Sequence, residues 1–547
     1  MVQQFAIDNK DSFNELINML EDGCTLGNNF LWDKNKPVCK LEFQDDYKKQ
    51  LEIDDIINGI NKEKNIVNIS VKNDLAYIYK ETKDGVTVTK EPFRQWVLSR
   101  KSGQPLSGNQ PYKFYKEYTE QEFDQVRSLV WKSKAFTIYN KAENFMVGKG
   151  YTYFKGMNKS DVSLLSFDIE TEGLNSSVDK LLLITNTYRK GDNLVSRVFR
   201  LDHYMDEGEM IQAWIAWVNQ HDPSILLGHN IVMFDLPFIN TRANINGVKL
   251  TIGRDNEELY FDKKPRELRV DGSQSYTYCR PMCFGREVVD TFFLVIKYDI
   301  GKKYTSYKLK SIVAQEGMEA SDRVMVDASK MRELWEIDRE RVIKYAEEDS
   351  KDPIKLYDLM ISTFFYLCPV VPKTFQMIIE SATGSQINAV MLRSYLQKKM
   401  SVAEPSELPE LKGAISFAVP GIYRNVLKID FGALYPSIIR QYKLYDKQKD
   451  PEEHFIKIVD YFYDNRQKYK KLYKETNDKY YDDMQAVAKV IANSCYGFLS
   501  ANGLNYNSPE NAAFITAKAR ELLTFSIKWA TNKDIDYWLN LFQEKTK

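Results

Sequence analysis

Residues 428–439 read Lys428-Ile-Asp-Phe-Gly-Ala-Leu-Tyr-Pro-Ser-Ile-Ile439, and they decide the architecture of the second half of the chain. An apolar run ends at Asp430, and a tight turn bearing Pro436 leads into further apolar residues. A single aspartate at the end of a strand usually has a structural role. The complete pattern, Asp-x-x-x-Leu-Tyr-Pro-Ser-Ile-Ile, is too specific to arise by chance, and it indicates a site for a metal and a nucleotide.

The composition indicates a multidomain protein without an overall charge bias. The 547 residues suffice for roughly three or four domains. Lysine plus arginine number 76, as do aspartate plus glutamate, so contact with a polyanion must come from local patches. Six dispersed cysteines favour reduced thiols. The first residues show no basic region before a long apolar stretch, and no apolar run approaches about 20 residues, so we expect a cytoplasmic protein with no membrane partner.

Hydrophobic patterns divide the chain into regions. Residues 1–160 mix short alternating runs with charged turns, and predict a mixed domain without a catalytic signature. Residues 161–370 alternate apolar strands with helical patterns, which predicts an α/β domain. A helical stretch at 376–400 then leads to a strand expected within 412–423. Residues 455–530 contain two long helical patterns, separated by a polar turn near residues 477 and 478.

Three segments of the α/β region carry acids at the ends of apolar elements. Asp168 and Glu170 lie two apart on one predicted strand, so both side chains project from the same face. Asp235 follows another strand, and Tyr345 lies one helical turn before Asp349. One acidic pair at a strand end is usually solvated, but three such elements predict a shared metal site. Four carboxylates around two metals suit phosphodiester hydrolysis, in which a phenol can orient the attacking water.

Two basic helical segments follow residue 455. Arg466 and Lys470 lie one turn apart in a run that contains no acid. Such a run is usually a solvated face. In the second segment, Lys489, Asn493 and Tyr496 fall at i, i+4 and i+7, so a cation, an amide and an aromatic ring line one stripe. A triphosphate requires fixed cations and a base pair requires a flat surface, which the two segments together supply.

These motifs, in this order, resemble those of family B DNA polymerases, most clearly the bacteriophage branch. The acidic segments resemble the three motifs of the proofreading exonuclease, and the 428–439 segment resembles the first catalytic motif of the polymerase. The resemblance implies catalytic roles for Asp168, Glu170, Asp235, Tyr345, Asp349 and Asp430. It implies metal ligation by Asp168, Glu170, Asp235, Asp349, Asp430 and the Phe431 carbonyl. It implies nucleotide binding by Phe431, Leu434, Tyr435, Arg466, Lys470, Lys489, Asn493 and Tyr496.

The same resemblance implies the cofactor, the partners and the architecture. Two Mg²⁺ ions are expected in each active site, with Mn²⁺ as a substitute, together with a DNA primer-template and a dNTP. The fold is expected to be multidomain α/β, with a ribonuclease H-like 3′-5′ exonuclease domain, two-helix fingers, an incomplete palm and no thumb. The expected ranges are 1–160 for the N-terminal domain, 161–370 for the exonuclease, 371–455 for the linker and first part of the palm, 456–515 for the fingers and 516–547 for the return to the palm.

The family places a second catalytic acid in a Gly-Asp-Thr-Asp hairpin. Asp534 and Asp536 form an Asp-x-Asp pair but lack the Gly-Asp turn, so we do not identify them with that acid. Asp430 alone cannot hold two metal ions. The expected function is therefore the N-terminal subunit of a split DNA-directed DNA polymerase with proofreading, acting in the host cytoplasm if viral, whose partner fragment supplies the acid and the thumb. The alternatives are a stand-alone 3′-5′ exonuclease from a truncated gene and a non-catalytic primer-template binding module.

Overall fold

The computed structural model describes residues 40–132, 134–270, 274–321, 323–324, 326–327, 330–410, 412–416, 418–419, 421–422, 424 and 430–546. Its amino-terminal part holds two small antiparallel sheets, ordered β1-β2-β3 and β4-β6-β5. The strands are β1 (Ile66–Lys72), β2 (Leu75–Thr82), β3 (Gly85–Pro92), β4 (Gln95–Ser99), β5 (Gln104–Pro105) and β6 (Phe114–Tyr118). The helices are α3 (Lys40–Asn58), α4 (Glu120–Lys132) and α5 (Lys141–Lys149). This arrangement agrees with the mixed domain predicted for the region.

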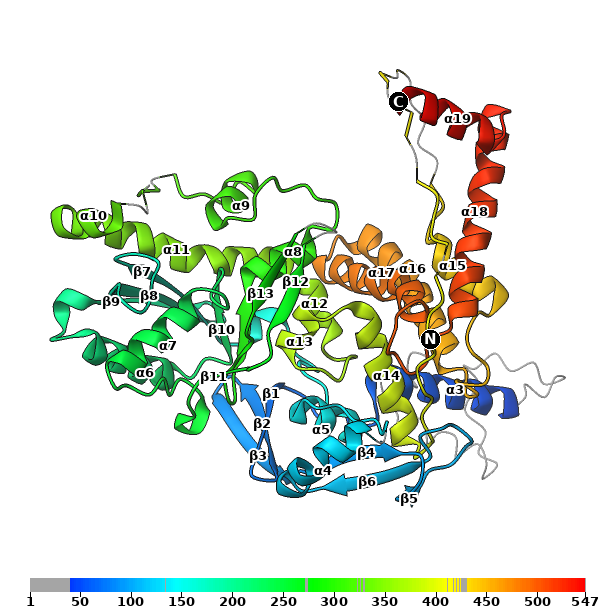
Figure 1. Cartoon of the computed structure of the whole chain (residues 1–547), viewed down its shortest axis with the longest axis horizontal. Helices are drawn as coiled ribbons and strands as arrows, with labels where there is room; N and C mark the ends of the chain where they lie inside the picture. The colour runs from blue at the N-terminus through cyan, green and yellow to red at the C-terminus, as the bar shows by residue number, and fades with distance from the viewer. Residues whose placement is uncertain are drawn as a thin grey trace, which may run out of the picture.

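A five-stranded mixed sheet, ordered β15-β10-β7-β8-β9, forms the centre of the α/β domain (Figure 1). Its strands are β7 (Leu164–Thr171), β8 (Leu181–Lys190), β9 (Asn193–Arg200), β10 (Ile225–Gly228) and β15 (Glu287–Asp290). Strand β7 pairs with β8 antiparallel and with β10 parallel. The apolar runs at 163–167, 181–185 and 224–228 therefore form strands, as predicted.

Helices cover both faces of this sheet, because its central strands are apolar on both sides. In Figure 1, α6 and α7 lie on one side and the long α11 crosses the other. The helices of this domain are α6 (Glu207–His221), α7 (Asp235–Ile245), α8 (Thr291–Tyr298), α9 (Leu309–Gln315), α10 (Met331–Ile337) and α11 (Arg339–Met360). Trp214 of α6 is fully buried against Phe167 of β7, with ring centroids 5.5 Å apart.

Short elements complete the domain. Two two-stranded ribbons lie between α7 and β15, formed by β11 (Tyr260–Phe261), β12 (Arg266–Arg269), β13 (Ser275–Tyr278) and β14 (Pro281–Met282). The 3₁₀ turns are η1 (Lys159–Asp161), η2 (Leu201–His203) and η3 (Arg254–Asn256).

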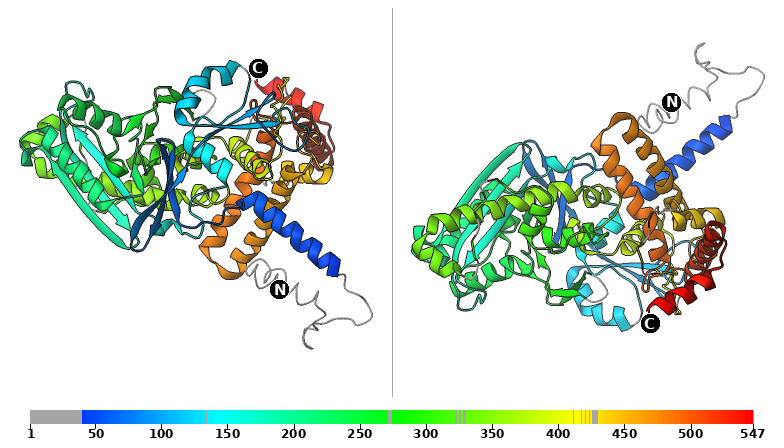
Figure 2. Two further views of the ribbon diagram at one scale, coloured as in Figure 1. Left: turned by 90° about the horizontal axis from the view of Figure 1, so that it is seen from below. Right: turned by 90° about the horizontal axis from the view of Figure 1, so that it is seen from above.

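The remainder of the described chain is helical. The helices are α12 (Ser362–Leu367), α13 (Phe375–Glu380), α14 (Thr383–Gln397), α15 (Leu434–Tyr442), α16 (His454–Thr476), α17 (Lys479–Leu499), α18 (Pro509–Thr531) and α19 (Ile535–Thr546). Helices α16 and α17 form an antiparallel hairpin that projects beside α3 (Figure 2). Its turn is at Asn477, which has φ 54°, and at Asp478, whose side chain caps α17. This hairpin is the pair of helices predicted around a polar turn.

Two details of the helical part differ from the prediction. Residues 455–530 hold three helices, because α17 ends at Leu499 and Pro509 begins α18. Proline lacks the N–H that a continuing helix requires, whereas it is well tolerated in the first turn of a new one. The strand expected within 412–423 is absent from the described residues of that range. Instead, Arg520 of α18 donates to the carbonyls of Lys412 and Gly413, both at 2.7 Å, so this backbone is bonded to a helix rather than to a neighbouring strand.

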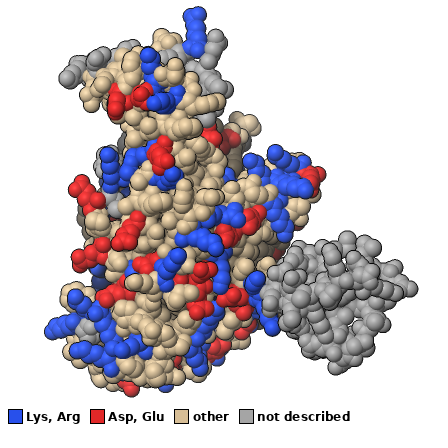
Figure 3. Space-filling view, turned by 90° about the vertical axis from the view of Figure 1, so that its right-hand side faces the viewer, with Lys and Arg blue, Asp and Glu red and all other residues tan. Residues whose placement is uncertain are grey.

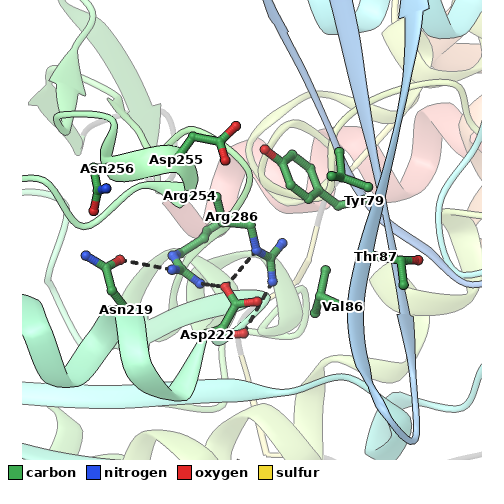
Figure 4. Close-up of a pocket in the computed structure, with 10 residues that line it drawn as sticks. Tyr79, Val86, Thr87, Asn219, Asp222, Arg254, Asp255, Asn256 and Arg286 are labelled. Atoms are coloured by element: carbon green, nitrogen blue, oxygen red, sulfur yellow. Dashed lines mark hydrogen bonds and ion pairs between the residues drawn. The ribbon is translucent and has the colours of Figure 1, made fainter.

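Buried polar contacts join the amino-terminal sheet to the α/β domain. Glu81 of β2 accepts hydrogen bonds from the Ser163 amide at 3.1 Å and the Ser224 hydroxyl at 2.6 Å. Beside this contact, a cavity of about 330 Å³ separates β2 and β3 from η3. There Arg254 and Arg286 both bind Asp222, as Figure 4 shows. The two domains therefore share a continuous, largely satisfied interface.

Charged side chains are mixed rather than segregated over the face shown in Figure 3, in keeping with the balanced composition. Across the described ranges, no helix combines the length and the apolar character needed to cross a membrane.

Candidate functional site

Strand β7 presents Asp168 and Glu170 on one face, as their spacing predicts. Across the ladder Asp168 pairs with Thr185, and Glu170 with Leu183. The Thr185 hydroxyl also donates to the carbonyl of Ala346, at 3.1 Å, and thereby fastens α11 to the same face of the sheet.

Helix α11 brings Asp349 over the pair on β7. Carboxylate oxygens of Asp168, Glu170 and Asp349 lie within 4.8 Å of one another. Asp349 is only 7% exposed, so these charges approach one another largely away from water. Residues separated by about 180 positions therefore form a single acidic cluster.

Asp235 approaches the cluster from the first turn of α7. Its side chain accepts a hydrogen bond, at 3.2 Å, from the backbone amide of Ile169, which lies between Asp168 and Glu170. Asp235 is 3% exposed. The four acids expected to act together are thus brought together by three elements.

The electrostatics of the cluster follow from burial and like charge. Burial raises the pKa of Asp168 well above its usual range, with further contributions from Asp235, Glu170 and Asp349. Burial raises the pKa of Glu170 to about 8, and the charge of Asp349 adds to this effect. The pKa of Asp235 rises to about 8 by burial and by the proximity of Asp290. Four such acids cannot all ionise near neutral pH without cations beside them.

Two cations that spacing did not predict lie against Asp349. Lys310 approaches one of its oxygens at 3.1 Å and also contacts the Tyr345 hydroxyl and ring. Arg323 binds the other oxygen at 2.8 Å, and it binds Asp352 at 2.6 Å. Both residues come from the segment between the second and third acidic motifs. Only their tertiary contacts identify them, although Lys310 directly follows a segment, 305–309, that also resembles the family.

The donor set fits a divalent metal. The three oxygens within 4.8 Å, with Asp235 close behind them, form a compact carboxylate group of the kind that Mg²⁺ and Mn²⁺ prefer. A cation there would also offset the repulsion that raises the pKa values of these acids.

Neighbouring polar residues hold the cluster in place. Asp290 ends β15 and accepts hydrogen bonds from the amides of Asn230 and Val232, at 2.7 and 2.9 Å. His229 binds Thr291 and the carbonyl of Tyr307, each at 2.9 Å, and burial lowers its pKa to about 4. Asp290 and His229 therefore shape the loop that precedes Asp235.

A second group of predicted residues gathers where α15 meets α17. Tyr435 and Tyr496 lie with ring centroids 4.9 Å apart. Lys489 and Asn493 are exposed on the stripe of α17 that leads to Tyr496, while Ile491 and Cys495 on the opposite face are buried. Arg466 on α16 and Lys489 on α17 lie at equal distances along the chain from the loop that joins the two helices. Lys470 is exposed and lies one helical turn closer to that loop.

Asp430 stands apart from these groups. It is exposed, as is Phe431, and Leu434 begins α15. Among the residues that the structure describes, Asp430 belongs to no group of three acids or histidines close enough to share a metal ion. Asp534 forms an ion pair with Lys528 at 2.9 Å, which agrees with its exclusion as a catalytic acid.

Two family models match parts of the chain, and both describe DNA polymerase family B. The model of the DNA polymerase family B exonuclease domain matches residues 173–312, and the model of DNA polymerase family B matches residues 447–545. The first range contains Asp235 and Lys310. The second contains Arg466, Lys489 and Tyr496.

Individual relatives and a solved structure agree with these matches. DNA polymerase 1 of Pyrococcus abyssi is 25% identical over 424 residues, which cover 70% of this chain and 53% of that protein. The DNA polymerase of Thermococcus gorgonarius is 24% identical over 428 residues, with 71% and 53% covered. The family B DNA polymerase from the archaeon Pyrobaculum calidifontis shares the fold with a TM-score of 0.67 at 18% identity, covering 85% of this chain and 71% of that one.

The chain spans about half the length of the curated relatives it matches. None of these three is a bacteriophage protein, so the bacteriophage-like branch stays a prediction. The matches in the α/β domain and in the helical part, together with the shared fold, show that this chain is similar to the family B DNA polymerases over both regions.

Proposed function

We propose that the chain degrades DNA from its 3′ end, as the proofreading part of a family B polymerase. The convergence of Asp168, Glu170 and Asp349 within 4.8 Å, with Asp235 behind them, is the observation that carries this proposal. These four acids would hold two divalent ions, Mg²⁺ or Mn²⁺. When bound, such ions supply an activated water and stabilise the leaving oxygen of a phosphodiester.

The remaining residues of the site would orient the attacking water and offset the negative charge of the acids. In this proposal the Tyr345 hydroxyl orients the attacking water. Lys310 contacts that hydroxyl and Asp349, so it would hold the phenol in place and offset part of the negative charge. Arg323 fixes the other oxygen of Asp349. This charge balance supports a site built for an anionic phosphodiester.

The test uses a single-stranded DNA labelled at its 5′ end, so that cleavage from the 3′ end gives a ladder. With Mg²⁺ or Mn²⁺ we expect a ladder, and chelation of the metal should abolish it. The variant Asp168→Asn with Glu170→Gln should lower the rate at least about a hundredfold, because loss of an outer-shell partner alone costs 10- to 100-fold. Asp192→Asn, in the exposed turn between β8 and β9, is the matched control. An unchanged rate in the double variant would refute the assignment.

We further propose that α15, α16 and α17 form half of a DNA-templated nucleotidyl transfer site. Arg466, Lys470 and Lys489 would meet the triphosphate of a dNTP, and Asn493 and Tyr496 would border it. Phe431 and Leu434 flank the entrance to α15, and Asp430 would bind metal with the Phe431 carbonyl. The exposed basic stripe and the Tyr435–Tyr496 contact support this placement.

A second metal-binding carboxylate is required for polymerisation. The relatives are about twice as long as the region that matches this chain. We therefore propose that polypeptide equivalent to their other half, continuous with this chain or carried by a partner, supplies that acid and the grip on the primer-template. Primer extension should be absent with the 547-residue chain alone, and should appear when a fragment equivalent to that half is added. Extension by the chain alone would contradict the proposal.

The same two assays distinguish the proposed function from two alternatives. A stand-alone exonuclease would give the 3′ ladder but no extension with any added fragment. It is favoured by the isolation of Asp430 from other acids within the described residues. A primer-template binding module would bind DNA and give neither product, which the compact acidic cluster disfavours.

A further inference from the structure

A second cavity lies where the amino-terminal part, α12 and the α16–α17 hairpin meet. Its volume is about 460 Å³, within the range of pockets that hold small organic ligands. Figure 2 shows α3 beside the hairpin at this junction. The cavity is separate from the acidic cluster and from the Lys489 stripe, since no residue of either lines it.

Six aromatic residues line the cavity. They are Phe154, Tyr366, Tyr461, Phe462, Tyr469 and Tyr480. The side chains of Met157 and Met484 also line the cavity, and methionine sulfur packs favourably against aromatic rings. Flat ring faces and adaptable methionines suit a planar ligand rather than a globular one.

The tyrosines also offer hydrogen bonds. Within the described residues, the hydroxyls of Tyr366, Tyr461, Tyr469 and Tyr480 have no hydrogen-bond partner in the protein. A phenol hydroxyl usually finds a partner when it is removed from water. These four groups are therefore available to a polar edge of a bound ring.

Lys155 determines the charge of the ligand that the cavity can bind. Among the described residues it is the only charged one that lines the wall, and its ammonium donates to the carbonyls of Asn58 and Asn61 at 2.7 and 2.6 Å. Three protons and two acceptors leave one N–H for a ligand. Burial lowers the pKa of Lys155 to about 7, and Arg393 and Lys62 add to this effect, so the empty cavity holds a partly protonated amine. An anion beside this amine favours its protonated form, which restores the positive charge and the third N–H.

Within the described part of the chain, that ammonium forms no ion pair with a carboxylate. Asp54 is bound by Lys62 at 2.5 Å, and Asp483 lies 3.4 Å from Lys479. Cages of aromatic rings can also hold organic cations, but the Lys155 ammonium would repel one. The wall thus combines a planar aromatic space with one positive charge, which matches a ligand that is aromatic and negative.

We propose that this cavity binds a planar aromatic anion about the size of a nucleoside monophosphate. Its ring lies among the tyrosines of α12, α16 and α17, and its anionic group meets Lys155. The cavity in Figure 4 differs, because both of its arginines already bind Asp222 and the carboxylate of Asp255 stands at its edge. The site proposed here is independent of the exonuclease and polymerase assignments.

The test uses adenosine 5′-monophosphate (AMP) as the probe, without divalent metal, and methionine methyl groups labelled with ¹³C as reporters. AMP should shift the methyl signals of Met157 and Met484, which line the cavity, and leave that of Met210, buried in α6, unchanged. Calorimetry should show adenosine binding at least about tenfold more weakly, since it lacks the charge-assisted bond. Phosphate alone and tetramethylammonium should not bind.

Two variants locate the ligand. Lys155→Met should weaken AMP at least about tenfold and leave the affinity for adenosine unchanged. Because Lys155 also caps α3, Tyr469→Ala is the second variant, and it should weaken AMP and adenosine alike. Tyr463→Ala, on the same helix but outside the wall, is the control. AMP shifts confined to other methionines, binding of tetramethylammonium, or an AMP affinity unchanged in both variants would each overturn the proposal.

Discussion

Lys310 is the residue of the exonuclease cluster whose contribution is easiest to isolate. Its ammonium touches Asp349 and the Tyr345 hydroxyl without being one of the acids. Lys310→Met should slow 3′ cleavage by roughly 10- to 100-fold, the usual effect of removing a partner of a ligand. Lys308→Met, exposed two residues away, is the control. Equal rates for the two variants in the 5′-label assay would show that Lys310 has no role.

Tyr435 is predicted to exclude ribonucleotides from the nucleotidyl transfer site. Its ring lies against Tyr496 in the first turn of α15, five residues beyond Asp430. The proposal places the sugar of the nucleotide over this ring, so we expect a 2′-hydroxyl to overlap it. In the polymerase completed with the missing half, Tyr435→Ala should lower the preference for deoxynucleotides by about tenfold or more. Tyr442→Ala, at the other end of α15, serves as the control. The measurement is the insertion ratio of paired ribo- and deoxynucleotides, and a constant ratio would make Tyr435 a packing residue.

At this scale the acids were predictable and the cations were not. A two-residue period places Asp168 and Glu170 on one face of a strand, and a helical turn places Tyr345 above Asp349, so local geometry suffices. Lys310 and Arg323 reach Asp349 only through the path of the chain between α8 and α10. No short-range pattern encodes that path.

Among the elements, α16 depends on a buried acid that precedes it. Asp450 is 1% exposed, and it accepts hydrogen bonds from the amides of His454 and Phe455 at 3.0 and 2.8 Å and from the Tyr395 hydroxyl at 2.6 Å. Asp450→Ala leaves three donors without this acceptor, at about 1–3 kcal/mol for each one left buried and unpaired. We expect hydrogen exchange at His454 and Phe455 to accelerate.

Asp464→Ala provides the comparison for that variant. Asp464 is an exposed acid on the same helix, bound to Arg440 at 3.0 Å, and surface ion pairs contribute little. Its exchange rates should match those of the unmodified protein. If both variants behave alike, Asp450 does not hold the start of α16.

The elements also show which sequence patterns are reliable. The helical hairpin was predictable because a polar turn interrupts two long amphipathic patterns. The third helix, α18, was missed because its pattern continues that of α17, although Pro509 marks its start. The strand expected before Asp430 relied on turn residues alone, and the described part of that segment is bonded to α18 instead. Residues 417, 420 and 423 of the range 412–423 lie outside the described chain, as do residues 425–429, which hold the apolar run expected to end at Asp430.

At the scale of the whole molecule, Arg393 joins α3, near the start of the described chain, to α14 and Val370 in its second half. This α14 residue is fully buried, and it donates to the carbonyls of Ile56, Ile57 and Val370 at 2.9, 2.6 and 2.8 Å. Arg393→Met removes these donors from the last turn of α3, where a cation also favours the helix dipole. We expect α3 to undock, seen as protease cleavage and faster exchange in residues 48–58. Lys399→Met, exposed beyond α14, should cause neither.

That long connection could not be read from the sequence, because a lone arginine in an apolar helix gives no indication of its partner. The hydrophobic pattern of the sequence suggests separate domains, whereas the packing does not separate them. One continuous hydrophobic core runs from α3 to α18. The expected domain ranges remain predictions.

The Arg393 contact also has a consequence for synthesis on the ribosome. The carbonyl of Ile57 receives its hydrogen bond from a residue 336 positions later. At a translation rate of 5–20 residues per second, Arg393 is synthesised roughly 20 to 70 s after the end of α3. During this interval the end of α3 has no Arg393 to bind, and all five strands of the central sheet, from β7 to β15, are translated before the interval ends. The order of synthesis therefore favours folding of the nuclease sheet before the amino-terminal helix docks.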